Sequence, residues 1–412
     1  MRATTETLPV TDLSDPIMFS DPFPRYAELR RTAPVSRAIH RETRKVEAFM
    51  LTRYEDVLLL HSDARFSSDP FKRGGAAPAL TRLLPRMFRL LIDSMVFKDD
   101  PEHKRLRGLV NKAFTPKMVQ RMADDVQAIA DQLLDDLIGR GEVDLIAGLA
   151  VPLPLAVIAT MLGVGDQDRD EFKHSVERVA NEAGGGSILG MVRKLPTGRR
   201  MIRLFEQLAD QRRAQPDERL ITALVQANDA DDVLSDQEIV AMIFLLLLAG
   251  LDTTSNLIGS SVLALIDHPE EQQRLRADPS LIETAVEELL RFTTPVPCGA
   301  TRVVLDDVEI AGVTLPKGSD VVGMIISANR DEDVFTQPDR LDLGRQPNRH
   351  LSFAFGNHFC LGNQLARMEA RMALRGLLER FEHIELAVPR EQLQWKPTES
   401  LRGLRRLPLR LS

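Results

Sequence analysis

The chain is poor in cysteine, with only Cys298 and Cys360 among its 412 residues. Two cysteines exclude the disulfide-stabilised scaffolds of secreted proteins and suit a reducing compartment. The first 15 residues are polar and predict no signal peptide. We therefore expect a cytoplasmic protein.

Long apolar runs, strong net charge and internal repeats are also lacking. The longest apolar stretch, residues 239–251, is too short to cross a bilayer and contains Gly250. It predicts a buried helix and no membrane anchor. The formal charge of −7 gives no reason to expect a nucleic acid partner. No period of 20–50 residues repeats, which excludes a solenoid.

Hydrophobic periodicity predicts a mainly α protein with a smaller β region. No low-complexity linker divides the chain, so we expect a single domain over 1–412, with an irregular proline-rich segment at about 1–24. Short strands are expected at 303–310 and 313–322, and a small hairpin at 35–51. Helices are expected at 54–61, 102–113, 117–139, 144–162, 167–183, 190–213, 217–226, 236–266, 270–276, 280–293 and 362–380.

The most informative segment surrounds Cys360, in Phe-Ala-Phe-Gly-Asn-His-Phe-Cys-Leu-Gly over 353–362. Its glycines allow tight turns and the close approach of a flat ligand. A helical pattern follows the cysteine, and a helix N-terminus stabilises an anionic sulfur. Phe353 and Phe359 would keep water away from the bond between this sulfur and its metal. The alternative is a buried, inert cysteine, but the pattern favours a thiolate ligand for a metal cofactor.

A second motif, Ala-Gly-Leu-Asp-Thr-Thr over 249–254, lies within the apolar helix 236–266. A buried carboxylate is costly unless a partner or water is supplied. The Thr253 hydroxyl can bond to the carbonyl of Ala249 and bend the helix. A loosened turn of this kind would leave room for a small ligand.

Together the two motifs resemble those of the cytochrome P450 superfamily in its soluble bacterial form. The spacing Phe-x-x-Gly-x-x-x-Cys-x-Gly resembles the haem-binding loop, and 249–254 resembles the oxygen-activating segment. The resemblance extends from Arg25 to the C-terminus. It implies a triangular-prism fold, with haem b between the long central helix and the cysteine loop, and Cys360 as the axial ligand. One departure is Ala354, where many soluble members have glycine.

The resemblance also implies roles for individual residues. Thr253 would hydrogen-bond the dioxygen being activated, and Asp252 would connect that site to solvent protons. The haem propionates would be held by His103, Arg107, Arg302 and His358. Other haem contacts are implied at Ala249, Gly250, Phe353, Gly356 and Gly362. The substrate pocket would be lined by Leu245, Leu248, Val296 and Leu401.

Glu288 and Arg291 lie three residues apart on a predicted helix and so meet on one face. The pair resembles the structural Glu-x-x-Arg pair of the family. Its third partner would be an arginine in the loop after it, Arg340 first and Arg345 second.

The implied activity is insertion of one oxygen atom from O2 into a medium-sized hydrophobic compound of the polyketide, terpenoid, steroid or fatty acyl class. Electrons would come from a ferredoxin or flavodoxin with an NAD(P)H reductase. Lys104, Lys112, Arg367 and Arg371 are the candidate docking charges. Segments 69–98 and 183–187 would cover the substrate channel.

Two alternatives remain at this stage. One is an enzyme whose substrate is held by an acyl or peptidyl carrier protein, suggested by the basic residues of 193–203. The other is a non-catalytic haem sensor, which the proton-relay motif disfavours.

Overall fold

The computed structural model describes residues 8–39, 46–73, 84–165, 169, 171–176, 188–229 and 232–412. It divides into two compact units, each assembled from separate segments of the chain. Unit 1 contains 1–73, 130–153 and 253–412, and unit 2 contains 74–129 and 154–252. Helix α13 (Asp236–Asp267) runs through the boundary, between Asp252 and Thr253. A single domain over 1–412 stays a prediction.

Unit 1 contains a six-stranded sheet in the order β1-β2-β3-β11-β8-β4. The predicted hairpin at 35–51 is confirmed, because β2 and β3 pair antiparallel. The two predicted strands after residue 302 each divide into two short ones. The strands of the sheet are β1 (Val10–Asp12), β2 (Val35–Ile39), β3 (Val46–Leu51), β4 (Phe66–Ser67), β8 (Arg302–Val304) and β11 (Asp320–Gly323).

Alternation along the strands directs side chains to both faces of this sheet. On β3, Phe49 and Leu51 belong to one apolar cluster, whereas Ala48 and Met50 belong to another. This is the period of two that a strand imposes on its side chains. Helix α3 (Tyr54–Ser62) contributes to the first cluster and α2 (Phe23–Thr32) to the second. Both faces of the sheet are therefore covered.

The remaining strands form small sheets. In unit 1, β9 and β10 make an antiparallel pair, and β12, β13 and β5 form a three-stranded sheet. In unit 2, β6 pairs with β7. Their bounds are β5 (Glu142–Asp144), β6 (Asn228–Asp229), β7 (Asp232–Val233), β9 (Val308–Ile310), β10 (Val313–Leu315), β12 (Ile384–Leu386) and β13 (Pro408–Leu411).

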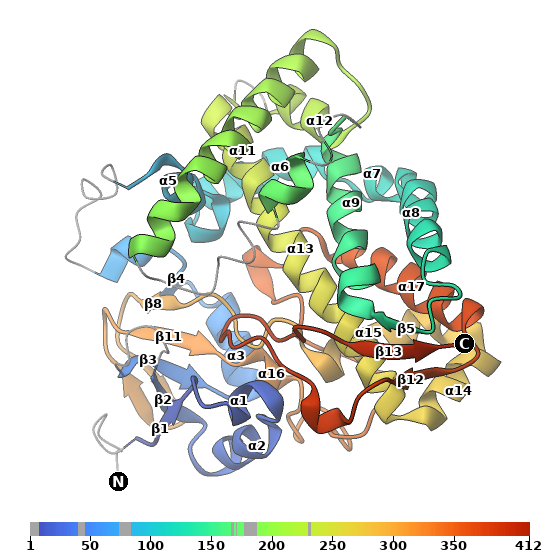
Figure 1. Cartoon of the computed structure of the whole chain (residues 1–412). Coiled ribbons are helices and arrows are strands. Elements are labelled where there is room, and N and C mark those ends of the chain that lie inside the picture. Colours follow the sequence, from blue (N-terminus) through green and yellow to red (C-terminus); the bar gives the residue numbers. More distant parts are fainter. Residues whose placement is uncertain are drawn as a thin grey trace. The chain divides into compact units, whose positions relative to one another are not determined.

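Helices are the main regular secondary structure of both units (Figure 1). Those of unit 1, besides α2 and α3, are α1 (Ile17–Ser20), α14 (Pro269–Ala277), α15 (Ile282–Thr293), α16 (Ile325–Ala328) and α17 (Asn363–Arg380). Those of unit 2 are α5 (Arg86–Ile92), α6 (Glu102–Ala113), α7 (Pro116–Arg121), α11 (Ile188–Ala214) and α12 (Leu220–Gln226). Helices α8 (Ala123–Asp135) and α9 (Pro152–Leu162) contain residues of both units.

Two sequence expectations about these elements need correction. The segment 1–24 is not irregular throughout, because β1, α1 and the start of α2 lie in it. The predicted helix 117–139 is two helices, since α7 ends before Met122 and α8 begins after it. The Thr115 hydroxyl accepts a hydrogen bond from the Met118 amide, and Pro116 follows it, so α7 has its own N-terminal cap.

Parts of two other predictions lie outside the described residues. Of the predicted helix 167–183, only residue 169 and residues 171–176 are described. Of the proposed channel cover, 183–187 and 74–83 are not described. The rest of 69–98 contains helical turns, including α5.

Within the described part of the chain, α13 alone is long and apolar enough to cross a bilayer. However, 56% of its most apolar window is buried inside the protein. Central helices of globular proteins meet the same criterion, so the finding gives only weak support for a membrane span.

Candidate active site

The backbone of the cysteine loop is closed by its own hydrogen bonds. The Cys360 amide donates to the Phe353 carbonyl at 2.9 Å, and the Asn363 side-chain amide donates to the Cys360 carbonyl at 2.7 Å. Helix α17 begins at Asn363, three residues after the cysteine. Cys360 therefore lies just before a helix N-terminus, where the dipole favours an anionic sulfur.

Two residues of this loop adopt the left-handed backbone conformation, Ala354 with φ of 58° and Gly356 with φ of 72°. At Gly356 a Cβ atom would lie 2.5 Å from the carbonyl oxygen of His61, at the end of α3. Glycine is therefore required there for conformation and for close approach. Ala354 holds the same kind of conformation with a side chain, at some cost in strain.

Aromatic side chains surround the loop. Phe353 is buried, whereas Phe355 and Phe359 are 46% and 38% exposed. Phe353 contacts the edge of Phe359, with ring centroids 6.4 Å apart, and the Arg367 guanidinium lies 4.4 Å from its ring centroid. That Phe353 and Phe359 keep water from a cysteine ligand stays a prediction. Both exposed rings precede the cysteine in sequence and offer apolar surface beside it.

Arg302 and His358, the two propionate candidates of unit 1, come from β8 and from the cysteine loop. Arg302 is only 5% exposed. His358 Nε2 lies 2.8 Å from the Ser68 hydroxyl. Burial, together with the Arg302 charge, lowers the pKa of His61 to about 4. Sequence reasoning missed His61, which is neutral at pH 7 and lies against both the Gly356 and Gly299 positions.

The two propionate candidates of unit 2 share one face of α6, at positions i and i+4. His103 is 3% exposed, and its Nδ1 lies 3.4 Å from the Asp100 carboxylate. Arg107 is half-buried. Arg105, between them in sequence, pairs instead with Asp232 and Glu238.

Helix α13 has one accessible stripe in an otherwise buried stretch. Ala249 is exposed, and Leu245, Leu248, Asp252 and Thr253 are half-buried. Spacings of three and four residues place them on one face. The sequence-based grouping of these residues is therefore consistent with their exposure.

The oxygen-activation motif does not interrupt the helix. Residues 236–267 are continuously α-helical, so the predicted loosened turn is not present as a break. Within unit 2, a Cβ atom on Gly250 would lie 3.1 Å from the Ile158 side chain of α9. Gly250 thus allows close packing of α13 on α9.

Glu288 and Arg291 form a fully buried ion pair, as expected from their spacing on α15. Arg291 Nε and Nη2 each donate to a Glu288 carboxylate oxygen at 2.8 Å, and both side chains are 0% exposed. The remaining Arg291 hydrogen bonds go to the carbonyls of Asn329, Pro338 and Arg340.

The choice of Arg340 as third partner was wrong. Arg345 Nε lies 3.0 Å from each Glu288 oxygen, whereas the Arg340 side chain is exposed. Arg340 contributes only its carbonyl, which accepts from both Arg291 and Arg345. The loop turns the Arg340 side chain outward and brings Arg345 back to the carboxylate.

The chain is similar to known proteins over most of its length. The cytochrome P450 family model matches residues 199–400. The chain is 37% identical over 397 residues to the polyketide biosynthesis cytochrome P450 PksS of Bacillus subtilis, covering 95% of this chain and 96% of that one. It belongs to the cytochrome P450 family. The relatives include monooxygenases and hydroxylases, so it is a monooxygenase of the haem-thiolate type, with haem b and a cysteine ligand.

Solved structures agree in fold. The PksS structure matches with a TM-score of 0.88 at 36% identity, covering 97% of this chain and 99% of that one. P450BioI, solved in complex with a hexadec-9Z-enoic acid-ligated acyl carrier protein, matches with a TM-score of 0.85 at 32% identity, covering 96% and 100%. The mainly α architecture with smaller sheets is thus the cytochrome P450 fold.

The residues of this P450 fit a haem. Unit 1 offers a cysteine thiol beside accessible phenylalanine rings, with a buried arginine as a cation for a carboxylate. Unit 2 offers an accessible, largely apolar helix face and the His103 and Arg107 pair. A flat, apolar group with two carboxylates needs these kinds of surface.

The second cysteine is unsuited to metal ligation. Burial raises the pKa of the Cys298 thiol to about 12, so it stays protonated at neutral pH. Its Sγ lies 3.6 Å from the Glu399 carbonyl. A ligand to iron must be a thiolate, which leaves Cys360 as the candidate.

Val296 and Leu401, the substrate candidates of unit 1, lie on adjoining segments. The Arg402 amide donates to the Pro295 carbonyl at 2.8 Å, beside both residues. Val296 and Leu401 are half-buried. The structure therefore brings these two predicted wall residues together.

Two of the four candidate docking cations are engaged within the protein. Arg367 binds Glu287 through Nε at 2.6 Å and Nη2 at 2.8 Å, and Arg371 pairs with Glu283. Burial opposes ionisation of Glu287, but hydrogen bonds from Arg367 and His350 lower its pKa to about 2. Lys104 and Lys112 are exposed on α6.

Proposed function

We propose that Cys360 is the axial ligand of the haem and that Asp252 and Thr253 deliver protons during oxygen activation. When bound, the haem supplies dioxygen activation and transfer of one oxygen atom to the substrate. The observation that carries the proposal is the contrast between the two cysteines. One precedes a helix N-terminus in a closed glycine loop, and the other is held protonated by burial.

Thr253 and Asp252 have complementary roles in this proposal. With haem bound, the Thr253 hydroxyl would supply a hydrogen bond at the oxygen site, and Asp252 would pass protons toward that hydroxyl from solvent. Their partial exposure on a buried helix supports both roles, since a proton path needs a polar group that solvent can reach.

The haem edge is held by cations in this proposal. Arg302 and His358 bind one part of it, and His103 and Arg107 bind another. Charge-assisted hydrogen bonds from such groups to carboxylates are strong. The burial of Arg302 and His103 supports this assignment, because a hydrogen bond from either side chain to a carboxylate would be shielded from water and therefore stronger.

The substrate is a medium-sized hydrophobic compound, and polyketide, steroid and fatty acyl classes all fit. Leu245, Leu248, Val296 and Leu401 line its pocket. Relatives named for polyketide biosynthesis, 6-deoxyerythronolide B hydroxylation and vitamin D(3) hydroxylation support this range. Electrons come from a ferredoxin or flavodoxin with an NAD(P)H reductase in the cytoplasm, and Lys104 and Lys112 provide docking charge.

A carrier-bound substrate is the second candidate. Arg199, Arg200 and Arg203 are exposed near one another on α11 and can contact an acidic carrier. The side chains of Arg193 and Lys194, also part of this basic segment, lie outside the described residues. The acyl carrier protein complex of P450BioI supports this candidate. The non-catalytic sensor has no comparable support.

The test is the spectrum of the dithionite-reduced protein with carbon monoxide. A strongly red-shifted Soret band is expected in the wild type and in Cys298→Ser, which is the matched control. Cys360→Ser should lose that band. Retention of the band in Cys360→Ser, or its loss in Cys298→Ser alone, would overturn the ligand assignment.

A further inference from the structure

Residues 395–404 form a hairpin near the C-terminus. Trp395 and Leu404 make an antiparallel bridge, and the Lys396 amide donates to the Gly403 carbonyl at 2.8 Å. Leu401, a predicted substrate contact, lies near the tip of this hairpin. Whatever holds the hairpin therefore also positions Leu401.

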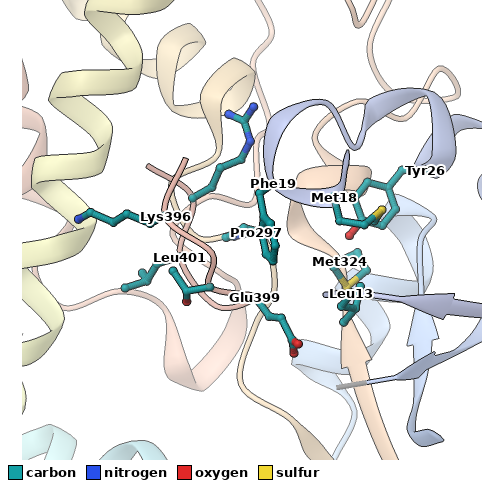
Figure 2. Close-up of a pocket in the computed structure, with 11 residues that line it drawn as sticks. Leu13, Met18, Phe19, Tyr26, Pro297, Met324, Lys396, Glu399 and Leu401 are labelled. Carbon is teal, nitrogen blue, oxygen red and sulfur yellow. The ribbon is translucent and has the colours of Figure 1, made fainter. Parts of the chain in front are cut away.

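One side of the hairpin is fastened to α13 through Asn256. Lys396 Nζ donates to Asn256 Oδ1 at 3.2 Å. Asn256 is 2% exposed, and a Cβ atom on Gly403 would overlap its side-chain amide. The hairpin backbone thus lies directly against this amide. Figure 2 shows Lys396 extending from the hairpin toward this helix, away from Tyr26.

The fastening point belongs to the same helix as the catalytic candidates. Asn256 follows Thr253 by three residues, about one helical turn. A hydrogen bond between a charged ammonium and a buried amide is stronger than one between neutral groups. The contact therefore sets the distance between the hairpin and α13 near Asn256.

The other side of the hairpin faces a small cavity of about 20 Å³. Leu401 and Pro297 line it on the hairpin side, and Leu13, Tyr26 and Met324 line it on the side of the N-terminal segment (Figure 2). Protein interiors are close-packed, so a void of this size leaves room for a side chain to shift. The hairpin is thus bonded to α13 through Lys396 and to residues 295–298 through the Arg402 amide and the Glu399 carbonyl, and Leu401 borders the small void.

We propose that Lys396 and Asn256 form a latch that holds the hairpin against α13 and thereby sets the size of substrate the enzyme accepts. With the latch closed, Leu401 narrows the pocket. With the latch broken, the hairpin moves toward the cavity and the pocket widens. The latch rests on the proposed function, because it requires that Leu401 faces the haem pocket.

The test compares two azoles that bind haem iron through a ring nitrogen, followed by the Soret shift. Imidazole is a single small ring, whereas clotrimazole carries three bulky aryl rings on its imidazole and so tests the size of the pocket. Lys396→Met keeps the apolar stem and removes the donor. We expect its preference for clotrimazole over imidazole to rise about tenfold, the scale of one lost charge-assisted hydrogen bond. Imidazole affinity should stay within about twofold of wild type.

Two variants on the same hairpin serve as controls. Lys396→Arg keeps a cationic donor and should restore the wild-type preference. Arg405→Met removes an exposed cation from the base of the hairpin and should leave the preference unchanged. Equal changes in Lys396→Met and Arg405→Met would overturn the latch, as would equal weakening of both azoles in Lys396→Met.

Filling the cavity tests the second half of the proposal. Leu13→Phe adds volume at the buried wall opposite Leu401 and should weaken clotrimazole relative to imidazole. Unchanged preference in this variant would contradict the role of the cavity. The carbon monoxide spectrum separates the two levels of inference. A thiolate band with unaltered azole preference refutes the latch alone, and absence of the band refutes the proposed function together with the latch.

Discussion

Replacing Arg345 with methionine tests the buried network around Glu288. Arg345 donates from Nε to both Glu288 oxygens at 3.0 Å, from Nη1 to the Thr336 carbonyl at 2.8 Å, and from Nη2 to the carbonyls of Gln337 and Arg340 at 3.3 and 3.1 Å. Its side chain is 10% exposed and that of Glu288 is 0% exposed. The substitution therefore removes one of the ties between α15 and this loop.

The expected cost follows from the partners that remain. Breaking a buried ion pair by removing one member costs about 3–5 kcal/mol. Glu288 keeps its two bonds from Arg291, together with bonds from the Asn348 side chain and the Asp342 amide. We therefore expect a loss near the lower limit, about 3 kcal/mol, in the free energy of unfolding.

Arg340→Met is the matched control. Its side chain is exposed and reaches only Gln337 Oε1, at 3.5 Å, while the carbonyl that the network uses is retained. The loss in the free energy of unfolding should stay within about 0.5 kcal/mol.

The assay is urea unfolding of both variants with the haem bound. With an m-value of about 3 kcal/mol/M, Arg345→Met should lower the midpoint by about 1 M. Arg340→Met should leave it nearly unchanged. Equal midpoints for the two variants, or a larger loss in Arg340→Met, would refute the assignment of Arg345 as the partner of Glu288.

Three further predictions concern the cysteine loop, a buried carboxyl and the proton path. Gly356→Ala should impair haem retention relative to the wild type, since its Cβ would meet the His61 carbonyl oxygen; wild-type retention would contradict the close approach. Burial raises the pKa of Glu369 on α17 from 4.5 to about 8. At pH values between these two, Glu369 is ionised in the unfolded chain and protonated in the folded protein. The free energy of unfolding should therefore fall as pH rises through about 4.5–8. Glu369→Gln should flatten that dependence when unfolding is measured at pH 5 and pH 8. Thr253→Ala should raise the ratio of released hydrogen peroxide to product by about tenfold or more, the scale of a lost proton-transfer group. Unchanged coupling of NAD(P)H oxidation to product would remove Thr253 from that role.

The sequence by itself determined the family and the local elements of the site. Cys360 in its glycine loop and the Asp252-Thr253 pair were found because their contexts are short and contiguous. The 12-residue helix α6 and the β2–β3 hairpin were predicted because side-chain periodicity and turn residues act over a few positions.

Tertiary structure alone decided contacts between segments distant in sequence. Arg345 was chosen over Arg340 by the path of a loop, and local patterns do not encode such a path. Burial, which is a property of the packed whole, set the pKa values of His61, Cys298 and Glu369. The Lys396–Asn256 bond joins residues 140 positions apart. No periodicity predicts such a bond, because only packing of the hairpin on α13 brings its two atoms together.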